Sequence, residues 1–182
     1  MVLRAVVAFA ALMSAAAPAL ALADVLEVTA SGFLIRHDVT VSGTPEVSWK
    51  ALLDIGSWWN SDHTYSGNST NLSIDARPGG CFCEKLTNGG GVSHMMVVFV
   101  SPNTVLRMSG GLGPLQSSGL AGGLTWRIVP APPGSKLEVS YSVGGYMQGG
   151  FDKIAPAVNG VLGEALNRLK LLIDTGKPVA PK

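Results

Sequence analysis

The residues best suited to ligand binding or catalysis in this chain of 182 residues begin with a short aromatic segment. Trp58 and Trp59 are followed closely by His63 and Tyr65. A tryptophan in a loop covers a large apolar area and offers one indole N–H donor, which is typical of the lid of a pocket. The alternative is that one tryptophan only fills the space between a sheet and a helix. We expect at least one of the two to line a cavity, and His63 to be a surface or capping residue.

Three further titratable residues stand in apolar or alternating segments. Both faces of the segment around His94 are mostly apolar, and a histidine there is more often a hydrogen-bonded core or rim residue than a catalyst. Glu84 and Arg107 would form a buried ion pair if both faced inward, and ordinary surface charges if both faced outward. We expect Glu84 to face outward, and the sequence leaves the side of Arg107 open.

The N-terminal segment has the pattern of a secretory signal peptide. Arg4 precedes a long apolar run, which closes on the small-x-small triplet Ala21–Ala23 before Asp24. The alternative is a retained membrane anchor, because residues 5–23 are nearly long enough to span a bilayer. Cleavage is favoured because the run ends in a cleavage triplet and not in a basic cluster. We expect residues 1–23 to be removed, leaving a periplasmic or secreted chain without a stable membrane anchor.

The two cysteines, Cys81 and Cys83, allow three interpretations. Cysteines of an exported protein usually pair. On a regular strand, however, residues i and i+2 have Cα atoms roughly 6.5 Å apart and parallel side chains, so a disulfide there would be strained. The pattern therefore favours two free thiols. A redox-labile disulfide and half of a zinc site remain open.

Charge and motif content exclude several classes of function. Lys and Arg number 13 against 12 Asp and Glu, and one of the basic residues, Arg4, belongs to the N-terminal segment, so the remainder is neutral. No basic cluster is present to bind a phosphate backbone, which argues against a nucleic-acid partner. The sequence has no nucleophile elbow, Walker A, zinc-protease or dinucleotide-binding motif. We therefore expect no cofactor and no bound metal.

The apolar pattern predicts an α+β domain over residues 24–175. A capped start at Thr44 and Pro45 predicts a short helix that reaches Leu53. Apolar residues spaced by three and four predict a long helix over Ile154–Ile173, about 30 Å long, which should lie across the sheet. The tail, residues 176–182, is expected to be disordered. Near-alternating polarity predicts seven strands: Phe33–Val41, Leu72–Asp75, Cys81–Leu86, Val92–Val100, Val105–Ser109, Leu124–Val129 and Leu137–Val143.

Five motifs span most of this domain: Trp58–Gly67, Asp75–Glu84, Leu106–Gln116, Thr125–Trp126 and Val143–Tyr146. Together they resemble the START-like, or SRPBCC (Bet v 1-like), superfamily over about residues 33–173. Within it, the chain is similar to an exported subgroup of the polyketide cyclase/dehydrase-like branch, which is related to activator of Hsp90 ATPase homologues.

The resemblance implies a helix-grip fold. In this fold a seven-stranded antiparallel sheet wraps around a long C-terminal helix, two short helices after the first strand close one end, and a hydrophobic cavity lies between. Members bind lipids, sterols, polyketides or other apolar molecules, and some catalyse cyclisation or dehydration. By position, the resemblance implies that the cavity is lined by Trp58, Trp59, Trp126, Tyr141, Val158 and Leu162.

The leading hypothesis is an exported protein that binds a lipid, aromatic or polyketide-like molecule. Polar groups among His94, Arg107, Tyr141 and Tyr146 would orient this ligand. The alternative is an enzyme of the same fold, a cyclase, dehydratase or lyase without a cofactor, in which His94 or Tyr141 performs acid–base work. Hsp90 is not expected as a partner, because it is absent outside the cytoplasm.

Overall fold

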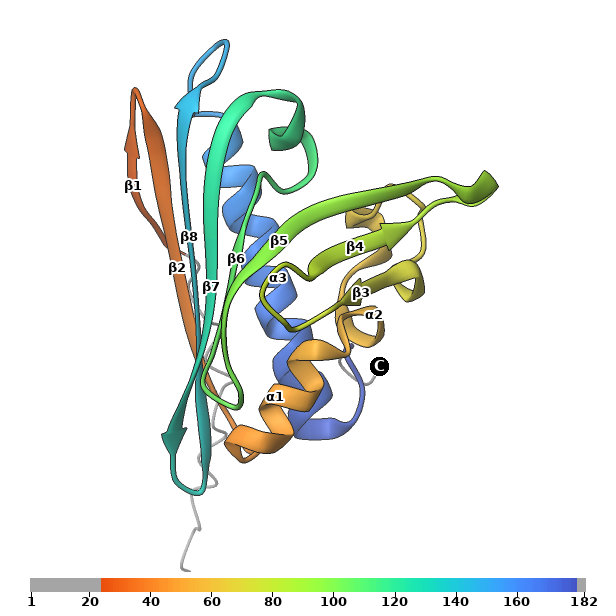
Figure 1. The fold of residues 1–182 in the computed structure, drawn as a ribbon. Helices are drawn as coiled ribbons and strands as arrows, with labels where there is room; N and C mark the ends of the chain where they lie inside the picture. The colour runs from red at the N-terminus through yellow and green to blue at the C-terminus, as the bar shows by residue number, and fades with distance from the viewer. Residues whose placement is uncertain (1–23, 180–182) are drawn as a thin grey trace, which may run out of the picture.

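The computed structural model describes residues 24–179, in which one antiparallel sheet curves around a long C-terminal helix (Figure 1). The predicted signal peptide, residues 1–23, and the last residues of the tail, 180–182, lie outside the described residues. The sheet has the strand order β1-β2-β8-β7-β6-β5-β4-β3. Its strands are β1 (Asp24–Thr29), β2 (Gly32–Val41), β3 (Leu72–Ile74), β4 (Cys81–Lys85), β5 (Gly91–Ser101), β6 (Val105–Ser109), β7 (Gly119–Ala131) and β8 (Gly134–Tyr146).

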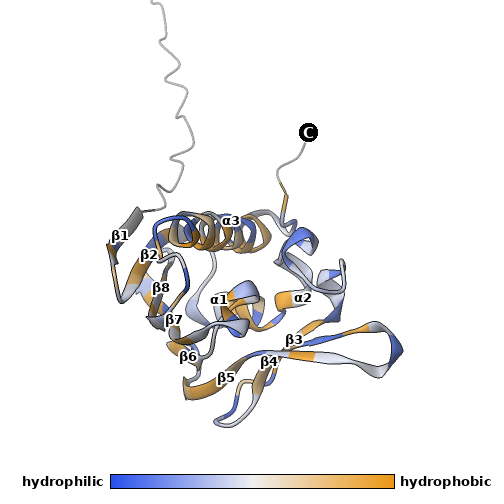
Figure 2. Ribbon diagram, turned by 90° about the horizontal axis from the view of Figure 1, so that it is seen from above, coloured by the Kyte–Doolittle hydropathy of each residue, from blue (hydrophilic) through white to orange (hydrophobic). Residues whose placement is uncertain are grey.

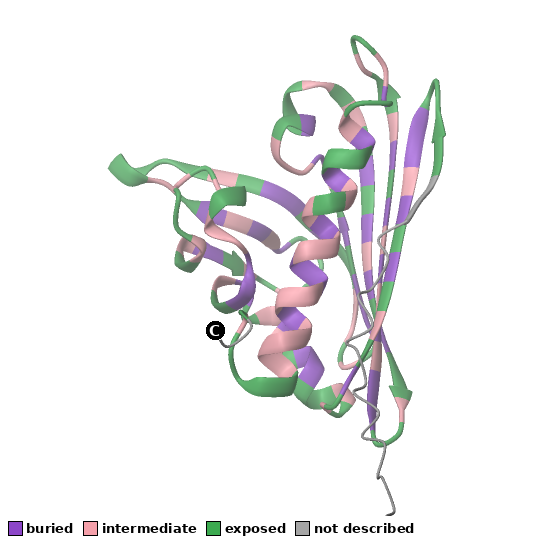
Figure 3. Ribbon diagram, turned by 180° about the vertical axis from the view of Figure 1, so that it is seen from behind, coloured by how far each residue is buried: buried purple, intermediate pink, exposed green. Residues whose placement is uncertain are grey.

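The long helix α3 (Ile154–Thr175) closes the concave side of the sheet, as the view from above shows (Figure 2). Its buried residues recur at spacings of three and four, which gives the helix one apolar face. Figure 3 shows these buried positions repeating along the helix. The helix ends where Gly176 adopts a left-handed conformation with φ of 75°. The buried residues of α3 are Ala155, Val158, Leu162, Ala165, Leu166 and Leu169.

Two short helices follow β2 and fill one end of the space between sheet and α3. Helix α1 (Pro45–Leu53) starts as its sequence indicates: the Thr44 side chain accepts a hydrogen bond from the amide of Val47, and proline occupies the first turn. Helix α2 (Ile55–Trp58) follows directly, and both helices contact α3. The α+β helix-grip prediction is thus confirmed.

The structure has one strand more than the seven predicted. Strand β1 begins immediately after the predicted cleavage point and pairs with β2 through a tight hairpin. Strand β7 also starts earlier than expected, because the glycine cluster at residues 119–123 belongs to the strand and pairs with the end of β8. Glycine is required at Gly122, where an added Cβ would lie 2.4 Å from the carbonyl oxygen of Gly110 and 2.8 Å from the Tyr141 ring.

The prediction of two free thiols was wrong. Cys81 and Cys83 form a disulfide, with their Cα atoms 5.4 Å apart. The spacing is shorter than in a regular strand, and the pairing of β4 with β5 shifts by one residue at the same place, between Phe82 and Cys83. This bulge leaves His94 of β5 without a partner on β4, since Cys83 pairs with Ser93 and Phe82 pairs with Met95.

The described part of the chain lacks both a membrane-spanning helix and a cluster of metal ligands. No helix within residues 24–179 is both long and apolar enough to cross a bilayer. Over the same range, no three His, Cys, Asp or Glu side chains lie close enough together to hold a metal ion.

Candidate functional site

A cavity of about 380 Å³ lies between the first half of α3, the inner face of β4 and β5, and two loops. One loop follows α2 and the other joins β6 to β7. The apolar part of its wall consists of Trp59, Phe82, Leu112, Pro114, Ile154, Ala157, Val158, Val161 and Leu162, together with Gly113. The polar residues of the wall are Asp62, His63, Thr64, Tyr65 and His94.

Helix α3 supplies one wall through five residues at helical spacing, from Ile154 to Leu162. Residues three and four apart share a face of a helix, so the same stripe that packs on the sheet continues into the cavity. The loop between β6 and β7 is held to β5 by hydrogen bonds from Gln116. The side-chain amide of Gln116 donates to the carbonyl oxygens of Ser93 at 2.9 Å and His94 at 3.4 Å. These bonds hold the loop from Leu112 to Pro114 over the cavity.

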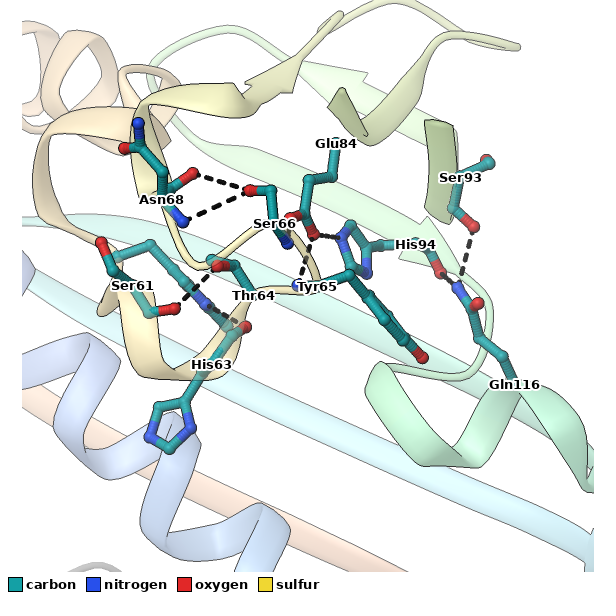
Figure 4. A network of polar contacts seen from close by, with 11 residues as sticks. Ser61, His63, Thr64, Tyr65, Ser66, Asn68, Glu84, Ser93, His94 and Gln116 are labelled. Carbon is teal, nitrogen blue, oxygen red and sulfur yellow. Dashed lines mark hydrogen bonds and ion pairs between the residues drawn. The ribbon is translucent and has the colours of Figure 1, made fainter. Parts of the chain in front are cut away.

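The polar centre of the site is a buried pair formed by Glu84 and His94. The Nε2 atom of His94 lies 3.0 Å from the Oε2 atom of Glu84, and the two side chains are 6% and 0% exposed (Figure 4). The bulge in β5 explains the inward position of His94, because it turns this residue to the same side as the buried Met95. The expectation that Glu84 faces outward was wrong.

Glu84 also binds the backbone of the loop that follows α2. Its Oε2 atom accepts from the amide of Tyr65 at 3.1 Å, and its Oε1 atom accepts from the amide of Ser66. Burial of this carboxyl raises its pKa, but the hydrogen bonds from Ser66, Tyr65 and His94 outweigh burial and leave the pKa below the ordinary value. The carboxylate is therefore ionised at neutral pH and can only accept hydrogen bonds.

The ionised carboxylate fixes the tautomer of His94. Because Glu84 accepts, Nε2 of His94 carries the proton, and Nδ1 of the neutral ring holds a lone pair. Burial lowers the pKa of His94 more than Glu84 raises it, which keeps the ring neutral at neutral pH. The ring lies against Phe82 with centroids 4.7 Å apart and against Tyr65 with centroids 5.9 Å apart.

A second histidine–carboxylate pair lies at the rim of the same cavity. The Nε2 atom of His63 is 3.0 Å from the Oε2 atom of Glu164 on α3, and Asn60 donates to the other oxygen at 2.6 Å. The carbonyl oxygen of His63 accepts from the indole of Trp59 at 3.1 Å. The His63 side chain is 35% exposed, so water competes with a ligand for its ring far more than it does for the ring of His94.

The structure brings four of the predicted site residues together. Trp59, His94, Val158 and Leu162 all line the cavity, and they come from the α2 loop, β5 and α3. Their roles in binding or catalysis remain predictions.

Trp58, Trp126 and Tyr141 lie in the packed core and not among the lining residues. The Trp58 ring packs on Trp126, with centroids 5.9 Å apart. The hydroxyl of Tyr141 accepts from the amide of Leu112 at 3.0 Å and donates to the carbonyl oxygen of Gly110 at 2.9 Å. Burial raises the pKa of Tyr141 to about 12. Through these two hydrogen bonds, Tyr141 stabilises the loop between β6 and β7 that lines the cavity.

Arg107 and Tyr146 lie on the outside of the sheet. The guanidinium group of Arg107 lies over the ring of Phe99, and its Nε atom donates to Thr125 at 3.1 Å. Tyr146, at the end of β8, is 76% exposed. Neither residue lines the cavity, because each stands at an outward position of its strand.

Sequence reasoning missed the role of Glu84 and of the loop amides that bind it. A signal for Glu84 was available, since Phe82 and Glu84 alternate with the two cysteines and a buried Phe82 places Glu84 on the same inner face. The contact between this carboxylate and the loop depends on tertiary folding and has no local signal.

A curved antiparallel sheet, a C-terminal helix across it and a cavity between them define a helix-grip protein of the START-like, or SRPBCC, class. A family model described as polyketide cyclase / dehydrase and lipid transport matches residues 32–174, and the chain belongs to this family. No curated protein sequence matched the chain.

Solved structures show the same fold at low sequence identity. A conserved protein of unknown function from Enterococcus faecalis has a TM-score of 0.59 at 14% identity, over 88% of this chain and 81% of that one. The Aha1 protein from Colwellia psychrerythraea has a TM-score of 0.55 at 19% identity, over 79% and 98%. CalU16 from Micromonospora echinospora has a TM-score of 0.53 at 16% identity, over 81% and 78%. These likenesses concern the fold alone.

Proposed function

We propose that this chain binds an apolar small molecule, of lipid, aromatic or polyketide type, in the cavity beside α3. The observation that carries the proposal is the cavity itself. Its volume of about 380 Å³ falls in the range of small-molecule sites, and its wall is mostly apolar around one buried polar pair, Glu84 and His94. The family description includes lipid transport, which agrees with this proposal.

A thermal-shift screen of lipids and aromatic compounds, combined with native mass spectrometry of the protein from its producing cell, tests the proposal. A ligand that binds only the folded state stabilises it by RT ln(1 + L/Kd), where L is the free ligand concentration, so Tm rises with the logarithm of the ligand concentration above Kd. Absence of both a co-purified small molecule and any shift across the library would refute it.

A substitution that fills the cavity connects binding to this site. Ala157 lines the cavity from an exposed position on α3, so Ala157→Trp should place an indole in the cavity without disturbing the core. We expect ligand affinity to fall at least about tenfold while Tm of the free protein changes little. Val47→Trp, at a position 49% exposed on α1, is the matched control and should bind like the wild type.

We also propose that the chain acts outside the cytoplasm, in the periplasm or as a secreted protein. The cleavage pattern before Asp24 supports export, and so does the Cys81–Cys83 disulfide, because disulfides persist in oxidising compartments. Expression of the full chain, fractionation and N-terminal sequencing should give a mature protein that starts at Asp24. A chain that keeps residues 1–23 would contradict the proposal. Hsp90 is not proposed as a partner.

A second candidate function is catalysis, and the Glu84–His94 pair favours it. A neutral histidine held by an ionised carboxylate is an arrangement suited to general-base work on a bound substrate. Tyr141 is a weaker candidate because both its hydrogen bonds are made to backbone groups. If the protein is a cyclase or dehydratase, His94→Gln should remove turnover and retain most of the substrate affinity. Unchanged turnover in that variant would refute the assignment.

A further inference from the structure

The charged groups that line the cavity, or that pair with its two histidines, are all carboxylates. Asp62 lines the cavity, and Glu84 and Glu164 lie directly behind the two histidines. None of the lining residues in the described chain is Lys or Arg. An anionic ligand would therefore lose its hydration without gaining a cation, which is costly for a carboxylate.

The first turn of α3, in contrast, favours an anionic ligand. It reaches the cavity through Ile154 and Ala157, and the positive end of a helix dipole favours anions. Its contribution is small beside the desolvation of a carboxylate, and three carboxylates oppose it. The electrostatics of the site thus favour an uncharged ligand over an acid.

The most buried polar side chain that lines the cavity, His94, offers a ligand an acceptor. His94 is 6% exposed and lines the cavity, and its Nε2 atom is occupied by Glu84. Among the residues that the structure describes, none donates a hydrogen bond to Nδ1 of His94. A donor in the cavity can therefore bind this lone pair, because His94 lines the cavity and the Nδ1 atom of its neutral ring accepts one hydrogen bond.

We infer that the cavity selects an uncharged apolar molecule that carries a hydroxyl group, an alcohol or a phenol, whose O–H donates to Nδ1 of His94. This inference rests on the proposed function and narrows it to one class of ligand. Glu84 is the positioning residue, because it holds the ring in the tautomer that accepts. Fatty acids and other carboxylates are excluded from this class by their charge.

Three matched probes test the inference on the wild-type protein at pH 8: para-pentylphenol, para-pentylanisole and para-pentylbenzoate. Hydrophobic burial alone would favour the anisole, which is the more apolar of the two neutral probes. One added hydrogen bond should reverse this order, so we expect the phenol to bind about threefold to tenfold more tightly than the anisole. The benzoate should bind at least about tenfold more weakly than the phenol.

The variant His94→Phe identifies the acceptor, since it keeps an aromatic ring at this position and removes Nδ1. We expect the preference for the phenol over the anisole to disappear. The matched comparison is His63→Phe at the rim, which should keep most of the preference because His63 is already 35% exposed to water. If His94→Phe does not fold, nitrogen NMR of the wild type replaces it: the Nδ1 resonance of His94 should shift with the phenol and not with the anisole.

The outcomes separate this inference from the proposed function. Equal or tighter binding of the anisole, or tight binding of the benzoate, would overturn the inference and leave cavity binding intact. The same holds if His63→Phe removes the preference and His94→Phe does not. If none of the three probes binds, the inference fails, and the library screen with native mass spectrometry decides the proposed function separately.

Discussion

Replacement of Glu84 by Gln tests the polar centre of the site most directly. The substitution keeps the size and shape of the side chain, so it creates no cavity. It removes the negative charge that accepts hydrogen bonds from the amides of Tyr65 and Ser66 and from Nε2 of His94. A neutral amide has one oxygen and one nitrogen, so it cannot accept all three bonds at once.

The magnitude follows from these three bonds. One buried donor left without an acceptor costs about 1–3 kcal/mol, and each retained bond loses roughly 1 kcal/mol when its acceptor becomes neutral. Part of this loss in stability is offset, because the neutral amide of the variant avoids the desolvation cost of a buried carboxylate. We expect Glu84→Gln to lower the free energy of unfolding by about 2–4 kcal/mol. In a domain of roughly 150 residues this corresponds to a fall in Tm of about 4–16 °C.

Thermal unfolding at pH 7, followed by circular dichroism, measures the effect. The matched control is Glu138→Gln on β8, where the carboxylate lies on the sheet surface near Lys136 and Arg127. Exposed ion pairs contribute little, so the control should change Tm by less than about 2 °C. A shift for Glu84→Gln as small as that of Glu138→Gln would refute the argument that Glu84 is a buried triple acceptor.

Glu84→Gln should also change how the free energy of unfolding depends on pH under acidic conditions. The pKa of Glu84 is lower in the folded state than its ordinary value of 4.5, so its contribution is complete above about pH 4.5 and is lost as the pH falls through the folded value. Glu84→Gln should therefore lose less stability than the wild type on acidification below about pH 4.5. Parallel curves for the two proteins in this range would contradict the assignment.

Two further predictions concern Tyr141 and the disulfide. Tyr141→Phe leaves the amide of Leu112 and the carbonyl of Gly110 without their partner, and urea denaturation should show a loss of about 1–3 kcal/mol. Burial raises the pKa of Tyr141 to about 12 in the folded state, so this residue ionises first in the unfolded state as the pH rises. The free energy of unfolding of the wild type should therefore fall between about pH 10 and 12. The same fall in Tyr141→Phe would argue against Tyr141 as the cause. A thiol assay on the protein unfolded without reductant should detect no free thiol, because Cys81 and Cys83 form a disulfide. Free thiols detected before reduction would contradict the disulfide.

The helices were predictable because their signals are local. The cap at Thr44 and the apolar spacing after Ile154 each act within a few residues, and the structure places α1 and α3 where those signals indicate. Strand β1 was missed because it is short and begins directly after the predicted cleavage point. The fold class followed from the order of elements and from the family motifs together.

The site was harder to predict because its geometry depends on a bulge. Regular alternation would place neighbouring residues of β5 on opposite faces, yet His94 and Met95 are both buried. Cys81 and Cys83 lie on β4 at the same irregularity, with their Cα atoms 5.4 Å apart. A one-residue insertion in a ladder is a property of two paired strands, and no pattern within one strand reports it.

The outward position of Arg107 could have been found from alternation alone. Its neighbours Leu106 and Met108 are both buried, which leaves the opposite face for the guanidinium group. Tyr146 follows the buried Tyr141 by an odd number of positions, so it belongs to the outer face as well. The resemblance to the family predicted that Trp58 and Trp126 line the cavity. In the structure their rings pack against each other in the core, and this contact leaves no room for a ligand between them.

The sheet order has a consequence for how the chain acquires its structure during synthesis. Strand β2 pairs along its whole length with β8, from Gly32 opposite Gly144 to Val41 opposite Ser135. The N-terminal hairpin of β1 and β2 therefore has no neighbour in the sheet until almost the entire domain is available. Such long-range pairing slows folding, and the inner edge of β2 stays unpaired until then. A chain truncated before Gly134 should consequently aggregate and not form a smaller stable domain.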